Sequence, residues 1–128
     1  MRITLTALHP EMPDGPWVGF SCAEGNGRGQ WSGPLPPLAS EHEVELALED
    51  GFQWNHNLRA SPSSAPCMDW SADGLRINAQ LLQVDSDGGA VLAIGGSIVL
   101  LSLQGASQDG PQWVELQARQ VALYPVAL

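Results

Sequence analysis

The chain has 128 residues, of which 44% are hydrophobic, so it is long and apolar enough to bury a core. Its 14 acidic residues outnumber the five arginines, it has no lysine, and its net charge of −9 repels phosphate backbones and anionic membranes. The charge therefore argues against nucleic acids and membranes as partners. It favours a basic protein partner, and it also keeps the chain soluble.

The sequence carries no pattern typical of export or membrane insertion. Residues 3–8 are too short and too rich in threonine for a secretion signal, and the apolar run 90–103 is too short to span a bilayer. Two cysteines, Cys22 and Cys67, do not form a disulfide framework. We therefore expect a cytoplasmic protein with free thiols, and a single Cys22–Cys67 bridge is the alternative for an exported one.

Short period-two runs separated by turn residues indicate an all-β fold. The chain contains 14 glycines and 10 prolines, and helical periodicity is nearly absent. We expect one β domain over residues 1–128, a small curled sheet or barrel with long Gly/Pro-rich loops. The C-terminal half, read as strand–turn–strand–bend–strand–loop–strand, suits a five-stranded Greek-key barrel of the OB type.

In chain order, the first expected strands cover residues 2–8 and 17–23. The proline-rich segment 9–16 separates them, because proline cannot donate to an interior ladder. Residues 24–40 are rich in Gly and Pro, and we interpret them as one long loop.

Residues 41–58 predict a β-hairpin with one acidic and one apolar face. Glu41, Glu43 and Glu45 alternate with His42 and two aliphatic residues, so the glutamates share one side of the strand.

The turn of this hairpin sets its register. A three-residue loop 49–51, with Gly51 in the left-handed conformation, places Trp54 on the apolar face and keeps the carboxylates away from it. The polar face then pairs Glu41 with Arg59, Glu43 with Asn57, and Glu45 with Asn55. Replacing Gly51 by a β-branched residue should then be markedly destabilising.

The C-terminal half predicts further strands. Residues 60–74 form a loop or short helical connection. A strand over 75–84 contains a bulge near residue 82, where its apolar phase slips. The remaining elements are a turn at 85–89, strands at 90–94 and 98–103 about a Gly-Gly bend, a loop at 104–111, and one last strand at 113–124 with a second bulge.

No catalytic, metal or cofactor motif is found. His42 and His56 would lie roughly 7–8 Å apart in the predicted hairpin and could bracket a metal with a cysteine, but a core histidine is the commoner outcome. The loop 85–89 lacks the downstream glutamate of a calcium loop. The glycine run 25–29 lacks the lysine of a phosphate-binding loop. Glu43 and Glu45 could serve as the paired carboxylates of a glycoside hydrolase, but their spacing occurs in every Glu-x-Glu strand. We therefore expect no cofactor and no enzyme activity.

Two of the five tryptophans, Trp31 and Trp70, lie in predicted connections. Exposed aromatic residues on loops bind sugars, bases or proteins, whereas buried ones close the ends of a barrel. Both outcomes stay open at this point.

These observations favour a small acidic protein-binding domain, of an inhibitor or immunity type, for a basic partner. The alternatives are a carbohydrate- or small-ligand-binding β-barrel that uses the loop tryptophans, and an accessory subunit that forms a homo-oligomer. The expected contact residues are Glu41, Glu43, Glu45, Asn55, Asn57, Arg59, Trp31 and Trp70.

Overall fold

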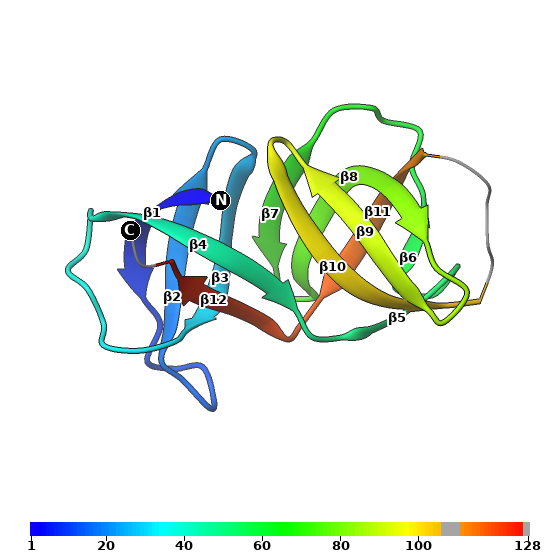
Figure 1. Cartoon of the computed structure of the whole chain (residues 1–128). Coiled ribbons are helices and arrows are strands. Elements are labelled where there is room, and N and C mark those ends of the chain that lie inside the picture. The colour runs from blue at the N-terminus through cyan, green and yellow to red at the C-terminus, as the bar shows by residue number, and fades with distance from the viewer. Residues whose placement is uncertain (106–110, 127–128) are drawn as a thin grey trace.

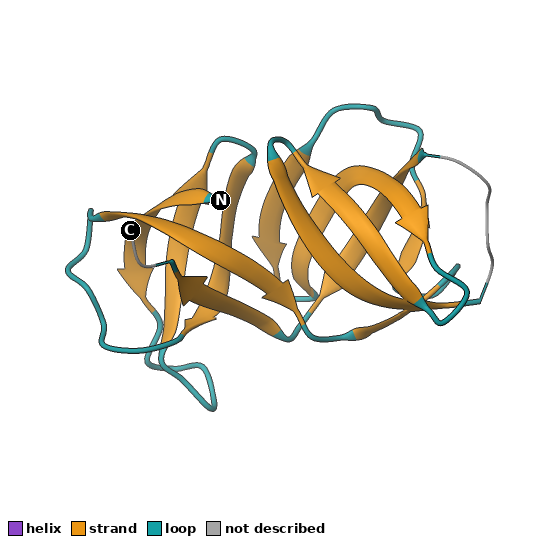
Figure 2. Cartoon of the chain, viewed as in Figure 1, coloured by secondary structure: helices purple, strands orange, loops and turns teal. Residues whose placement is uncertain are grey.

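The computed structural model describes residues 1–105 and 111–126, and every regular element in them is a β-strand (Figures 1 and 2). The predicted all-β class is therefore confirmed. The strands are β1 (Arg2–Leu8), β2 (Trp17–Cys22), β3 (Gly25–Trp31), β4 (Glu41–Leu48), β5 (Gly51–Gln53), β6 (Leu58–Ala60), β7 (Cys67–Ser71), β8 (Gly74–Val84), β9 (Gly89–Ile94), β10 (Ser97–Gln104), β11 (Gln112–Ala118) and β12 (Val121–Pro125).

Five strands close into a barrel in the order β12-β4-β1-β2-β3, seen around the two termini in Figure 1. The closure is a parallel pairing of β12 with β3, which sets Leu123 beside Trp31. Its interior is apolar and includes Ile3, Leu5, Phe20, Val44 and Leu123. The expected barrel exists, but it is built from the first 48 residues and β12 rather than from the C-terminal half.

The other strands form a curled sheet beside the barrel. Its long strand β8 pairs with β7, β9 and β11, while β10 extends it through β9, and β5 and β6 pair with β10 and β11 (Figure 1). A second set of aliphatic side chains fills the space under this sheet, including Leu58, Ile77, Leu92, Leu101 and Leu116. The predicted bulge is confirmed between Leu81 and Gln83.

Two short crossings join the barrel to the curled sheet, at residues 49–50 and 119–120. The Glu49 N–H donates to the Gln120 carbonyl at 2.8 Å. The Asp50 carboxylate accepts the backbone N–H groups of Arg119 and Gln120 at 2.9 and 2.8 Å. One aspartate therefore holds both crossings together. The phase change that we interpreted as a bulge in one last strand is the place where the chain leaves β11 and enters β12.

The predicted hairpin of residues 41–58 is wrong, although its faces are right. The side chains of Val44, Leu46 and Leu48 point into the core, and Glu41 and Glu45 are exposed. However, β4 pairs with β1 and β12, whereas β5 runs parallel to β10. A period-two pattern specifies which side of a strand is buried, but it does not specify the neighbouring strand.

Gly51 does not adopt the left-handed conformation that the hairpin required, and it begins β5. The polar pairs expected across the hairpin are therefore absent among the described residues: Glu41 lies opposite Thr4, Glu43 opposite Arg2, and Glu45 opposite Tyr124.

The expected long loop 24–40 is wrong in its first half, because residues 25–31 form β3. A side chain at Gly27 would lie 2.8 Å from the Phe20 ring, and one at Gly29 would lie 2.9 Å from Leu123. The glycines of this strand therefore let its neighbours pack closely and do not mark a loop.

Two other expected segments also differ from the structure. The segment 60–74 contains β7 rather than a helical turn. Most of the expected loop 104–111 lies outside the described residues.

Candidate functional site

The predicted contact residues do not form one site. Glu41, Glu43 and Glu45 lie on β4 of the barrel, whereas Asn55, Asn57 and Arg59 lie at the β5–β6 end of the curled sheet. The two groups were expected to face each other across a hairpin, and that hairpin does not exist.

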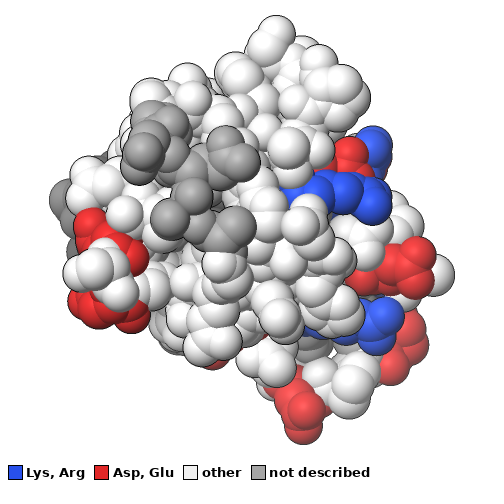
Figure 3. Space-filling view, turned by 90° about the vertical axis from the view of Figure 1, so that its right-hand side faces the viewer, with Lys and Arg blue, Asp and Glu red and all other residues white. Residues whose placement is uncertain are grey.

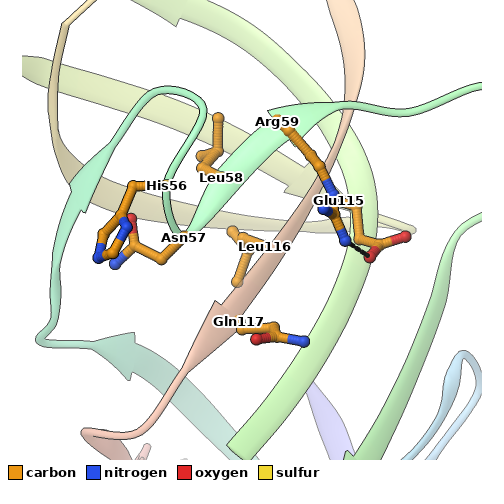
Figure 4. Close-up of a pocket in the computed structure, with 7 residues that line it drawn as sticks. All are labelled: His56, Asn57, Leu58, Arg59, Glu115, Leu116 and Gln117. Atoms are coloured by element: carbon orange, nitrogen blue, oxygen red, sulfur yellow. Dashed lines mark hydrogen bonds and ion pairs between the residues drawn. The ribbon is translucent and has the colours of Figure 1, made fainter. Parts of the chain in front are cut away.

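Asn57 and Arg59 line a small hollow of about 60 Å³ with His56, Leu58, Glu115, Leu116 and Gln117 (Figure 4). The Asn57 side chain accepts the Gln53 N–H and donates to the Gly51 carbonyl, and therefore fixes the β5–β6 turn. Asn55 occupies the same turn with a φ of 65°. The side-chain amide of Asn57 is therefore used within the turn.

Arg59 takes part in a row of charges across the curled sheet. Its guanidinium lies 3.2 Å from Glu115, which also lies 3.9 Å from Arg76. Arg76 in turn forms two hydrogen bonds with the Asp69 carboxylate, at 2.6 and 3.1 Å. Hydrogen bonding from Arg76 lowers the pKa of Asp69. The row balances its own charges and leaves no free cation or anion to attract a ligand.

Trp31 and Trp70, which we expected in loops, lie in strands β3 and β7 and pack against neighbouring groups. Trp31 is only 5% exposed, and its indole N–H donates to the Pro34 carbonyl at 3.0 Å. Trp70 is half-buried, with Trp17 at 6.0 Å between ring centroids and the Arg28 guanidinium 5.6 Å above its ring. The structure therefore places both tryptophans in packing contacts, which is the alternative that the sequence left open.

The histidines and cysteines do not converge. His42 hydrogen-bonds to Ser40 at 2.7 Å on the barrel, whereas His56 lies on the curled sheet. In residues 1–105 and 111–126 no group of three or more His, Cys, Asp or Glu side chains is arranged to hold a metal ion. Both cysteines are free, and burial raises the pKa of Cys22.

The most distinctive surface lies between the barrel and the curled sheet. We call it the barrel–sheet groove, a hollow of about 430 Å³ lined by Glu45, Leu46, Ala47, Ile98, Val99, Leu100 and Tyr124. A second hollow of about 330 Å³ shares four of these residues and continues past Arg2 and Glu43. The groove therefore draws its walls from β4, β10 and β12.

Three large apolar or aromatic side chains of the groove are exposed to solvent. Leu100 is 72% exposed, Ile98 60% and Tyr124 43%. Strand β10 alternates, so that Val99 and Leu101 fill the core while Ile98 and Leu100 point outward. Exposed apolar residues that cluster beside polar ones are typical of a protein-binding surface. Their exposure was not expected from the sequence, because β10 is apolar on both faces and such strands are usually buried.

The rim of this groove is acidic. Glu45 is exposed opposite Tyr124, and the Tyr124 hydroxyl donates to Glu49 at 3.4 Å. Glu43 differs, because it lies opposite Arg2 and its carboxylate is 3.4 Å from the Met1 amino group. Glu45 is therefore the lining carboxylate best placed to attract a cation, and Glu49 lies near it through its hydrogen bond with Tyr124.

Much of the positive charge of the chain is paired away from the groove. Arg28 lies 3.6 Å from Glu11, and Arg59 and Arg76 belong to the charge row described above. On the curled-sheet end of the molecule, basic atoms lie beside acidic ones (Figure 3). The 14 acidic residues outnumber the five arginines, so the chain keeps a surplus of negative charge.

Comparisons with protein-family models, curated proteins and solved structures find no match. Within the described ranges, no helix has the length and apolarity needed to cross a membrane.

Proposed function

We propose that this protein is a small acidic binding domain that captures a basic protein through the barrel–sheet groove. An inhibitor or immunity-type role, in which the domain neutralises a basic enzyme, suits its size and charge. The observation that carries the proposal is the exposed Ile98, Leu100 and Tyr124 cluster beside the exposed carboxylate of Glu45.

The composition of the groove supports protein binding over small-ligand binding. Protein interfaces combine an apolar centre, in which aromatic residues are enriched, with a polar rim that water reaches. The groove has this composition, because Ile98, Leu100 and Tyr124 supply exposed apolar and aromatic surface beside the carboxylate of Glu45. Burial of Trp31 weakens the sugar-binding alternative, because it leaves the half-buried Trp70 as the more accessible of the two tryptophans on which that alternative depended.

The charge of the chain supports a basic partner. A net charge of −9 creates a field that speeds association with a positively charged protein and repels acidic competitors. Because ions screen exposed charges beyond about 8 Å at physiological salt, capture of such a partner should weaken as salt is raised.

The test is affinity capture from a native lysate at low and at high salt, with the wild-type chain, Glu45→Gln and the control Asp73→Asn. The control removes an exposed carboxylate of the curled sheet. We expect a basic protein that is retained at low salt, released at high salt, and retained less by Glu45→Gln than by Asp73→Asn. A result with no retained protein, or with nucleic acid as the main retained species, would refute the proposal.

A further inference from the structure

We infer that the barrel–sheet groove receives one large apolar side chain of the partner, carried on a segment with basic residues on both sides of it. This inference rests on the proposed function and specifies which feature of the partner is recognised. It follows from the shape of the groove, from the distribution of charge along its rim, and from the repulsion that a second acidic copy would meet.

The centre of the groove provides an apolar contact surface. Leu46 and Val99 are buried below it, while Ile98, Leu100 and Tyr124 rise around it. These side chains come from three strands, so a side chain that enters the hollow touches the barrel and the curled sheet together. Aromatic side chains gain most from such a site, because each buries about 150–250 Å².

The rim places carboxylates where basic residues of the partner would lie. Glu45 borders the groove on β4, and Glu49 is linked to it through the Tyr124 hydroxyl. Glu43 belongs to the same strand face, but the Met1 amino group lies 3.4 Å from its carboxylate and offsets its charge. Binding of the partner's basic residues should therefore depend on Glu45 more than on Glu43, although the two glutamates are only two positions apart.

A second copy of the chain is a poor occupant. Two copies that met through this face would be related by a two-fold axis, and each would bring the same rim carboxylates to the interface. With a net charge of −9 on each copy, like charges would then face each other. The same charge opposes an anionic membrane surface. A basic protein segment is the occupant that the charge favours.

The test titrates the isotopically labelled full chain with the capped peptide Lys-Lys-Phe-Lys-Lys and follows backbone amide chemical shifts. The matched peptides are Lys-Lys-Ser-Lys-Lys, which lacks the apolar side chain, and Glu-Glu-Phe-Glu-Glu, which reverses the charge. We expect shift changes at residues 45–47, 98–100 and 124. Binding of the serine peptide should be about tenfold weaker, and the acidic peptide should produce no change.

Two variants then test the rim. Glu45→Gln should weaken binding of the phenylalanine peptide by about two- to fivefold, and Glu43→Gln should weaken it less. Equal affinities for the phenylalanine and serine peptides would overturn the inference, as would shift changes confined to residues outside the groove. Equal losses in the two variants would overturn it as well.

Failure of this inference is distinguishable from failure of the proposed function. If the peptide titration fails while capture of a basic protein stays sensitive to salt and to Glu45→Gln, the partner binds at the groove through another feature and only the inference is wrong. If capture is also insensitive to Glu45→Gln, the proposed function fails as well. Sedimentation supplies one further check, since a dimer that Leu100→Ser dissociates would show that a second copy covers the groove.

Discussion

Asp50 and Gly51 are adjacent residues, and the structure predicts that replacing Asp50 lowers the stability of the fold while replacing Gly51 hardly changes it. The Asp50 carboxylate accepts the backbone N–H groups of Arg119 and Gln120 and so joins the two crossings between barrel and curled sheet. Gly51 is exposed, and a Cβ atom added there would meet no atom within 4 Å. A loss of stability is therefore expected at Asp50 and not at Gly51.

The magnitude at Asp50 follows from the two N–H groups that would lose their acceptor. Hydrogen bonds to charged groups contribute about 1.5–3 kcal/mol, and partial solvent access at this half-buried residue keeps the loss near the lower end. We expect Asp50→Ala to lower the free energy of unfolding by about 2 kcal/mol. Asp50→Asn retains one acceptor and should lose less, while Gly51→Val should stay within about 0.5 kcal/mol of the wild type.

Urea unfolding of Asp50→Ala, Asp50→Asn and Gly51→Val measures these differences, with Asp73→Ala as an exposed aspartate outside the crossing. A hairpin turn with left-handed Gly51 would give the reverse order, because a β-branched residue is strained in that conformation by about 1–3 kcal/mol. A large loss in Gly51→Val together with a neutral Asp50→Ala would therefore refute the described crossing.

Three further predictions concern the contact between β3 and β7 and two titratable groups. Gly25→Ala should destabilise the chain by more than about 3 kcal/mol in urea, because its φ is +146° and the new Cβ would overlap the carbonyl oxygen of β7; a smaller change would place β3 and β7 further apart. The pKa of Asp69 is lowered by its bonds to Arg76, so its contribution, below about 1 kcal/mol for this exposed pair, is full at neutral pH and is lost as pH falls below about 4. The stability gap between wild type and Asp69→Asn should therefore close in acid, and a gap that widens there would contradict the pairing. Because burial raises the pKa of Cys22, the pH midpoint of its alkylation rate in Cys67→Ser should lie above the usual thiol pKa of about 8.5. A midpoint at or below that value would show an unburied thiol.

The sequence predicted strand faces well and strand neighbours poorly. The alternation from Glu41 to Leu48 identified the buried side of β4, because each strand shows its own period directly. Its partners β1 and β12 lie near the opposite ends of the chain. Nothing local in the pattern of residues 41–58 distinguishes such remote partners from an adjacent strand, so the hairpin was the simpler interpretation.

Glycine composition misled the interpretation of residues 24–40. Three glycines at positions 25, 27 and 29 follow the period of a strand, and two of them face the packed side chains of Phe20 and Leu123. This alternation was the available signal. Turn-forming composition outweighed it, because Gly and Pro usually mark loops.

The candidate site was predictable only in part. The acidic face of β4 was visible in the sequence, and Glu45 does border the groove. The exposure of Ile98 and Leu100 could not be predicted, because an apolar pattern does not show whether one face of a strand or both faces are buried. The joining of β4, β10 and β12 into one surface depends on the placement of the barrel against the curled sheet.

The central claim is that a basic protein binds at the barrel–sheet groove. The most direct measurement is quantitative capture at low salt with the wild type, Leu100→Ser and Leu38→Ser, because both leucines are exposed, by 72% and 51%, and only Leu100 lines the groove. We predict a basic protein that the wild type and Leu38→Ser retain alike and that Leu100→Ser retains about tenfold less. Equal retention of that protein by both leucine variants would contradict the claim.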